Sequence, residues 1–154
     1  MLASDIPLLS QRGPDLGERM RNAMHDAFAL GADKVALIGS DLPALPSQHV
    51  IDAFTMLNDA DLVLGPSPDG GFYLIAARQD VALTFEGVEW GTGTVLQQVA
   101  DAAVDAGLTV GFARPWFDSD TCDDLRRLMH EADPNTAVRT RAWSNLRRNL
   151  RLWK

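Results

Sequence analysis

The chain has 154 residues, 46% of them hydrophobic, which is enough for one globular domain with a buried core. Its net charge of −7 argues against nucleic acid as a general partner. No apolar run approaches the roughly 20 residues needed to span a bilayer. The first residues, MLASDIPLLSQ, lack the features of a secretory signal. Cys122 is the single cysteine, so an internal disulfide is excluded and we expect a cytoplasmic protein.

The charge is unevenly distributed along the chain. Residues 134–154 contain six basic and no acidic side chains, so residues 1–133 form an acidic body. In the basic tail, Trp143, Leu146, Leu150 and Trp153 fall near one face of an expected amphipathic helix. Two alternatives follow for this helix: peripheral contact with an anionic membrane, or packing against the acidic body of the same chain.

Apolar periodicity predicts alternating helices and strands. The apolar run 34–39 has the pattern of a strand buried on both faces, and Ser47 is suited to cap the helix that follows it. The expected elements, in chain order, are helix 14–31, strand 34–39, a helix from Ser47, strand 61–65, strand 72–77, a helix from Thr92 or Thr94 to Gly107, strand 108–113, a helix after residue 121 and a last helix from about residue 135.

This alternation favours an α/β fold whose sheet is mostly parallel. One connection cannot be parallel, because the Gly/Pro-rich corner 66–71 is too short to contain a crossover helix. Strands 61–65 and 72–77 are therefore predicted to be antiparallel to each other. The expected sheet is mixed.

Acidic residues follow three of the predicted strands or turns. Asp41 comes directly after strand 34–39, Asp69 lies in the corner 66–71, and Asp118 and Asp120 follow strand 108–113. In open α/β sheets, ligands bind at the carboxyl edge of the strands. Carboxylates there suit Mg²⁺ or Mn²⁺ together with a bound phosphate, and Asp41 and Asp120 fit such a site if their loops converge.

Each acidic loop also has a purely structural explanation. Asp41 is suited to cap the next helix, Asp69-Gly70 is a turn signal between strands, and Asp118 or Asp120 is suited to an N-cap. The sequence pattern alone leaves these alternatives open.

Five segments in order resemble a bacterial glycosyltransferase family of the arsenosugar-biosynthesis type. They are QRGPDLGERM (11–20), IGSDLPALP (38–46), LGPSPDGGFYLIA (64–76), EWGT (89–92) and DSDTCDDL (118–125). That family has the GT-A nucleotide-sugar transferase fold. It is more distantly similar to the guanylyltransferases that act on the molybdenum cofactor and on phospholactate.

The resemblance implies a GT-A-like three-layer sandwich over residues 1–133 and metal-dependent transfer of a sugar from a nucleotide-diphospho-sugar to a small-molecule acceptor. It also implies site roles. Asp41 would be the metal- and diphosphate-binding acid, with Asp118 and Asp120 as further Mg²⁺ or Mn²⁺ contacts, and Asp69 would position or deprotonate the acceptor. The implied substrate-binding residues are Gly70, Gly71, Trp90, Thr92, Glu18 and Arg19.

One departure from the family pattern affects these expectations. Family members usually begin with a further βαβ segment that carries a Gly-rich turn and a Lys-Thr-Arg-Leu motif, and no such segment precedes Gln11. We therefore expect an N-terminally truncated fold with an uncovered sheet edge, which favours a homo-oligomer. Two other functions stay open: nucleotidyl transfer that releases pyrophosphate, and a non-catalytic remnant that serves in assembly.

Overall fold

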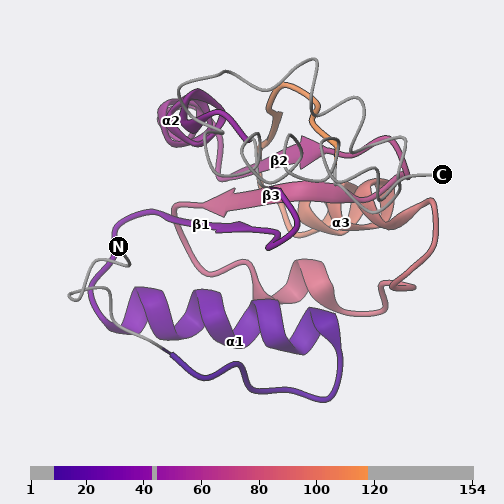
Figure 1. Ribbon diagram of the computed structural model, residues 1–154. Coiled ribbons are helices and arrows are strands. Elements are labelled where there is room, and N and C mark those ends of the chain that lie inside the picture. Colours follow the sequence, from indigo (N-terminus) through magenta and orange to yellow (C-terminus); the bar gives the residue numbers. More distant parts are fainter. Residues whose placement is uncertain (1–8, 43–44, 118–154) are drawn as a thin grey trace, which may run out of the picture.

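The structure is a computed structural model that describes residues 9–42 and 45–117 (Figure 1). The helices and strands predicted between residues 14 and 113 are confirmed, with ends shifted by a few residues. A short 3-10 helix, η1, was not predicted. The elements are α1 (Leu16–Ala29), β1 (Val35–Ile38), α2 (Ser47–Met56), β2 (Leu62–Pro66), β3 (Phe72–Ala77), η1 (Ala82–Phe85), α3 (Val95–Asp105) and β4 (Val110–Phe112).

The strands form one mixed sheet in the order β1-β3-β2-β4. β3 is antiparallel to both β1 and β2, whereas β2 and β4 are parallel. β1, β2 and β4 therefore run in one direction and only β3 opposes them, as the mixed, mostly parallel prediction required. The carboxyl ends of those three strands consequently meet at a single edge of the sheet.

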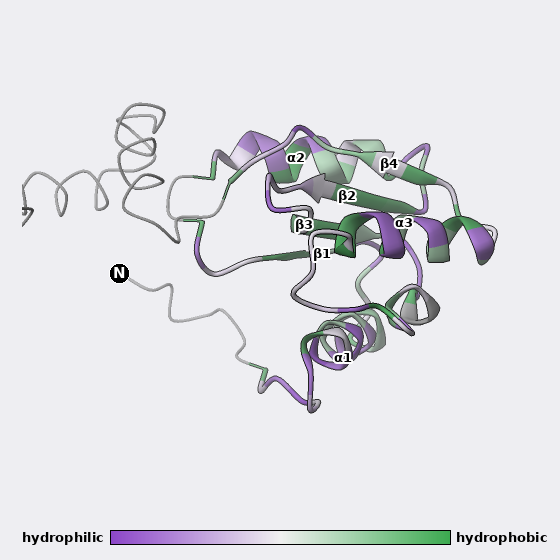
Figure 2. Ribbon diagram, turned by 90° about the vertical axis from the view of Figure 1, so that its right-hand side faces the viewer, coloured by the Kyte–Doolittle hydropathy of each residue, from purple (hydrophilic) through white to green (hydrophobic). Residues whose placement is uncertain are grey.

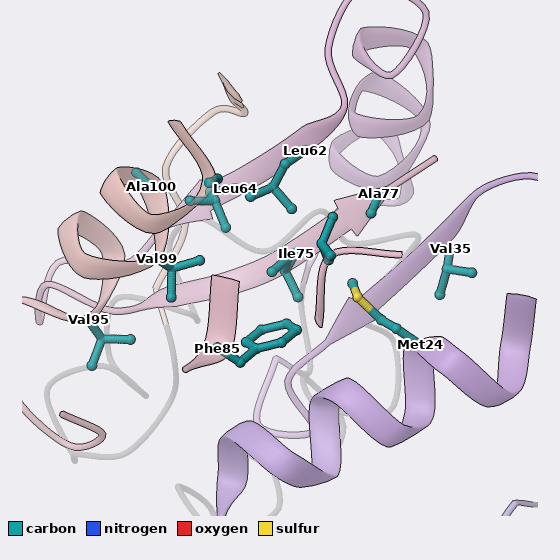
Figure 3. Close-up of a cluster of buried hydrophobic side chains, with 12 residues drawn as sticks. Met24, Val35, Leu62, Leu64, Ile75, Ala77, Phe85, Val95, Val99 and Ala100 are labelled. Atoms are coloured by element: carbon teal, nitrogen blue, oxygen red, sulfur yellow. The ribbon is translucent and has the colours of Figure 1, made fainter. Parts of the chain in front are cut away.

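Helices cover both faces of the sheet and make a three-layer sandwich. Because successive strand residues point to opposite faces, Leu62 and Leu64 pack toward α1 and α3, whereas Val63 packs toward α2. Figure 3 shows the first cluster, in which Met24 reaches from α1 and Val99 from α3 toward the strands. In Figure 2 the strands are mostly hydrophobic, while each helix alternates hydrophobic and hydrophilic residues.

Local signals explain where α1 begins and ends, whereas α2 begins without a side-chain cap. Asp15 caps α1, since its carboxylate accepts a hydrogen bond from the Glu18 N–H at 2.8 Å. Gly31, with φ +95°, follows the last turn of α1. The expectation that Ser47 caps α2 is wrong: Pro46 holds the cap position, and no side chain bonds there. Asp41 is therefore not the cap of α2 either.

Asp61 ties β2 to β4 through a set of hydrogen bonds. Its carboxylate accepts from the backbone N–H of Thr109 at 2.9 Å, from the Thr109 hydroxyl at 2.7 Å and from the Arg78 guanidinium at 2.7 Å. The Thr109 backbone bond first, and then the Thr109 and Arg78 side chains, lower the pKa of Asp61 from 3.8 to about 2. The charged Asp61 carboxylate therefore stabilises the folded state.

We expect Asp61→Asn to lower thermal stability near neutral pH and to have less effect near pH 2. The folded-state pKa of about 2 lies below the unfolded value of 3.8, so this contribution is present above about pH 4 and is lost as pH falls toward 2. Melting temperatures of wild type and variant from pH 2 to 7 would measure it. Asp59→Asn is the control, because Asp59 is exposed. An equal loss at every pH would contradict the assignment.

β1 and β4 are the edge strands of the sheet that the described residues form. The expectation that strand 34–39 is buried on both faces is wrong: β1 has only one strand neighbour among the described residues, Val35 alone is buried, and Ile38 is 53% exposed. Self-association through this edge stays a prediction. Within the described ranges, no helix has the length and apolar character needed to cross a bilayer. The expected basic helix of residues 134–154 lies outside those ranges.

Candidate functional site

A pocket of about 650 Å³ opens at the carboxyl edge of the sheet. Its volume falls in the range of roughly 300–1,000 Å³ that is typical of small-molecule sites. Its walls come from α1, the strands β1 and β3, the loop after β1, the corner between β2 and β3, and the loop before α3. The predicted site residues that line it are Arg19, Asp41, Asp69, Gly71, Trp90 and Thr92.

The remaining predicted site residues lie elsewhere. Gly70 belongs to the same corner but does not line the pocket. Glu18 lines a smaller neighbouring cavity of about 270 Å³, which also contacts Trp90. Asp118 and Asp120 lie outside the described residues, so their expected contact with a shared ion stays a prediction.

Asp41 is delivered to the pocket by the end of β1. The Gly39 N–H donates to the Tyr73 carbonyl at 3.1 Å, and the chain leaves the sheet after this bond. Asp41 is exposed, and its nearest polar contact is the Ser40 hydroxyl at 3.4 Å. Among the described residues it has no ion pair. Its carboxylate is therefore available to a ligand.

Asp69 sits in a corner whose backbone is fixed by its own hydrogen bonds. The Ser67 N–H donates to the Gly71 carbonyl at 3.0 Å, and the Gly70 N–H donates to the Ser67 carbonyl at 3.2 Å. The Gly71 N–H in turn donates to Oδ1 of Asp69 at 3.0 Å. The predicted turn role of Asp69-Gly70 is confirmed. The turn also orients one carboxylate oxygen and leaves Oδ2 without a partner in the described chain.

Gly70 joins this corner to the loop before α3. Its φ is +86°, and a Cβ there would overlap the carbonyl oxygen of Gly93. The Gly70 carbonyl accepts from the Leu96 N–H at 2.9 Å. Gly70 is therefore a structural residue of the pocket rather than a wall residue.

Hydrogen bonds to α3 also hold the loop 89–94. The Thr92 hydroxyl donates to the Glu89 carbonyl at 2.8 Å. Gln98 on α3 accepts from the Glu89 N–H at 2.9 Å and donates to the Thr94 hydroxyl at 2.7 Å. Thr92 thus faces the pocket from a loop with a defined shape.

Trp90 is held between α1 and η1. A Cβ at Gly17 would lie 2.7 Å from the Trp90 ring, so the absence of a side chain at position 17 allows this contact. The Phe85 and Trp90 ring centroids are 6.3 Å apart. Trp90 is half-buried and separates the main pocket from the smaller cavity.

We expect Gly17→Ala to destabilise the fold by a net amount of up to about 2 kcal/mol, because the new methyl group would push against Trp90 at a cost of about 1–3 kcal/mol. Helix propensity alone favours alanine by about 1 kcal/mol, so a loss would report the contact. Urea unfolding of the single variants and of Gly17→Ala/Trp90→Ala would measure the coupling. In the Trp90→Ala background, Gly17→Ala should be neutral or stabilising. A gain in both backgrounds would contradict this packing.

Sequence reasoning missed an aromatic network beneath the pocket. The Tyr73 hydroxyl donates to the Arg114 carbonyl at 2.9 Å and lies 2.8 Å from Nδ1 of His49. Because the single Tyr73 hydroxyl proton goes to that carbonyl, Nδ1 of His49 carries a hydrogen. Burial raises the pKa of Tyr73 to about 12 and lowers the pKa of His49. No local sequence signal marks this network, since its members are 24 and 41 residues apart.

The pocket contains two carboxylates rather than a complete metal cluster. Nowhere in residues 9–42 and 45–117 does a group of three His, Cys, Asp or Glu side chains come close enough to hold an ion. Mg²⁺ is commonly bound by one or two carboxylates together with substrate phosphates. Asp41 and Asp69 are therefore compatible with a cation that binds together with a nucleotide.

The fold and this pocket define an α/β protein with a mixed sheet and a ligand-sized pocket at its carboxyl edge. A crystal structure from Desulfovibrio desulfuricans, described as a "putative nucleotide-diphospho-sugar transferase", matches with a TM-score of 0.80 and 37% sequence identity. The match covers 91% of this chain and 62% of that chain, so this chain spans less than two thirds of that relative's length. The predicted α/β fold class with a mixed sheet is confirmed, whereas the N-terminal truncation stays a prediction.

The chain belongs to the bacterial family described as "Uncharacterized protein conserved in bacteria (DUF2064)", whose model matches residues 1–92. This match includes the segments of Arg19, Asp41, Asp69 and Trp90. No curated protein matches the chain. The resemblance to a bacterial family similar to nucleotide-sugar transferases is confirmed. The arsenosugar-biosynthesis type stays a prediction.

Proposed function

We propose that the protein is a metal-dependent glycosyltransferase that transfers a sugar from a nucleotide-diphospho-sugar to a small-molecule acceptor. The observation that carries the proposal is the pocket itself, because distant parts of the chain bring Asp41, Asp69 and Trp90 to one cavity at the carboxyl edge of the sheet. The similarity to the transferase-type structure supports the same class of reaction.

In this proposal Asp41 holds the Mg²⁺ or Mn²⁺ ion, with Asp118 and Asp120 as further ligands. When bound, the cation neutralises charge that develops on the diphosphate leaving group. Gly71 has no Cβ and lets a sugar or phosphate approach the backbone closely. In the sequence, residues 118–120 come after β4, whose carboxyl end lies at the same edge as that of the parallel strand β2.

Asp69 serves the acceptor side of the reaction. Its Oδ1 is held by the Gly71 N–H, so Oδ2 is free to accept a hydrogen bond from an acceptor hydroxyl. As the acceptor oxygen bonds to the anomeric carbon, the bond from that carbon to the diphosphate oxygen breaks. The hydroxyl proton passes to Asp69.

Calorimetry with UDP-sugars and GDP-sugars, with and without Mn²⁺, tests the proposal. We expect one nucleotide class to bind only in the presence of the metal and to be released by EDTA. Product analysis then distinguishes the reactions, because glycosyl transfer releases a nucleoside diphosphate and nucleotidyl transfer releases pyrophosphate. Absence of binding under every condition would refute the proposal and favour a non-catalytic role.

A further inference from the structure

We propose that the acceptor is a small anion with an apolar body, and that Arg19 pairs with its negative group. This inference rests on the proposed function and identifies the chemical class of the second substrate. It depends on the partners of Arg19, the charges in the pocket and the residues that surround Arg19 on α1.

Within the described part of the chain, Arg19 differs from the neighbouring Arg12 and Arg21 in having no acidic partner. Arg12 pairs with Asp26 at 2.7 Å, and Arg21 lies 3.7 Å from Glu18. Nε of Arg19 donates to the Gly13 carbonyl at 3.0 Å, and in the described part of the chain no carboxylate pairs with it. The Gly13 bond fixes the base of the guanidinium and leaves its two terminal nitrogens for a ligand. A guanidinium presents parallel N–H donors that match a carboxylate.

The charges in the pocket leave one role for Arg19. Among the described residues that line the cavity, Arg19 carries the only positive charge, and Asp41 and Asp69 carry the negative charges. In the proposed function Asp41 meets the cation and Asp69 meets the acceptor hydroxyl. Arg19 is left to neutralise an anionic group on the ligand.

The residues that share the pocket-facing side of α1 with Arg19 are apolar. Leu16, Arg19, Met20 and Ala23 all line the pocket, and their spacing of i, i+3, i+4 and i+7 places them on one helical face. Leu16 is 54% exposed, so part of this face is open to a ligand. A hydrated diphosphate gains little from such a wall. An organic anion would bury its apolar part there while its charge meets Arg19.

Two matched probes test the inference: 4-hydroxyphenylacetate, which is anionic, and 2-(4-hydroxyphenyl)ethanol, which is neutral and of similar shape. Binding is followed by ¹⁵N chemical shifts of the protein, first alone and then with UDP and Mg²⁺, which, unlike Mn²⁺, does not broaden the signals. We expect the anion to bind at least about tenfold more tightly, since a hydrogen bond to a charged partner is the stronger kind. Arg19→Gln should remove this preference, Arg19→Lys should keep part of it, and Arg21→Gln, as control, should keep all of it.

Equal affinity of the two probes for the wild type would overturn the inference, as would failure of both to bind. A preference that survives Arg19→Gln would also overturn it. If Arg19→Gln instead weakens Mn²⁺-dependent nucleotide binding and leaves the probe preference intact, Arg19 belongs to the donor site and the inference is wrong. If the wild type binds nucleotide but does not prefer the anionic probe, this inference alone is overturned. If the wild type does not bind nucleotide, the proposed function is overturned.

Discussion

Asp41→Asn is expected to weaken Mn²⁺-dependent binding of the nucleotide-sugar by at least about 100-fold, since loss of even an outer partner of a metal ligand costs about 10- to 100-fold. Asp41 lies just after the carboxyl end of β1, lines the pocket and has no ion pair in the described chain. The proposed cation would lose its first protein ligand. Calorimetry with the donor and Mn²⁺ measures the effect.

The fold should tolerate this substitution, because Asp41 is exposed and caps no helix. Melting temperatures of wild type and variant should agree within a few degrees. Asp101→Asn is the matched control: Asp101 is an exposed acid on α3 that accepts from Gln97 at 2.7 Å and lies outside the pocket. Metal-dependent binding by Asp41→Asn as tight as that of Asp101→Asn would contradict the role given to Asp41.

Gly70→Ala is expected to destabilise the fold by about 2–5 kcal/mol. The left-handed conformation costs an alanine about 1–2 kcal/mol, and overpacking adds about 1–3 kcal/mol. At Gly70 the φ is +86° and a Cβ would overlap the Gly93 carbonyl oxygen, so both costs apply. The corner would also move away from the loop before α3, which opens the pocket. Urea unfolding, analysed by midpoint and slope, measures the loss.

Gly31→Ala separates the two costs. Gly31 has φ +95°, and nothing lies within 4 Å of a Cβ built there. This variant should therefore lose only about 1–2 kcal/mol, from backbone conformation alone. Equal losses at Gly31 and Gly70 would show that the corner relaxes and that the Gly93 contact does not constrain the pocket.

Local patterns were sufficient to predict much of the fold. The continuous apolar run 34–39 predicted a strand, although not its place at the edge of the sheet. The short corner 66–71 required an antiparallel pair. The residues of α1 could also have been divided between the two cavities by helical periodicity. Glu18 lies about 100° around the helix from Arg19, so only one of them faces the main pocket.

Tertiary packing supplied what local patterns could not. The contact of Gly17 with Trp90 joins residues far apart in the chain, and so does the bond from Tyr73 to the Arg114 carbonyl. Gly17 and Gly70 matter because they have no side chain: a Cβ at Gly17 would clash with the Trp90 ring, and a Cβ at Gly70 would overlap the Gly93 carbonyl oxygen. The contacting residue is distant in the sequence, so the residues around each glycine do not predict the contact.

Paramagnetic broadening by Mn²⁺ would show whether the cation binds beside Asp41 in the pocket. Substoichiometric Mn²⁺ is added to ¹⁵N-labelled protein with the bound nucleotide-sugar, and the loss of amide signals is mapped. Our account predicts that the amides of Gly39, Asp41 and Gly71 broaden first, because these residues line the pocket, while Gly31 and Asp101 stay sharp. Broadening centred on another acidic surface, with the pocket amides unchanged, would contradict the account.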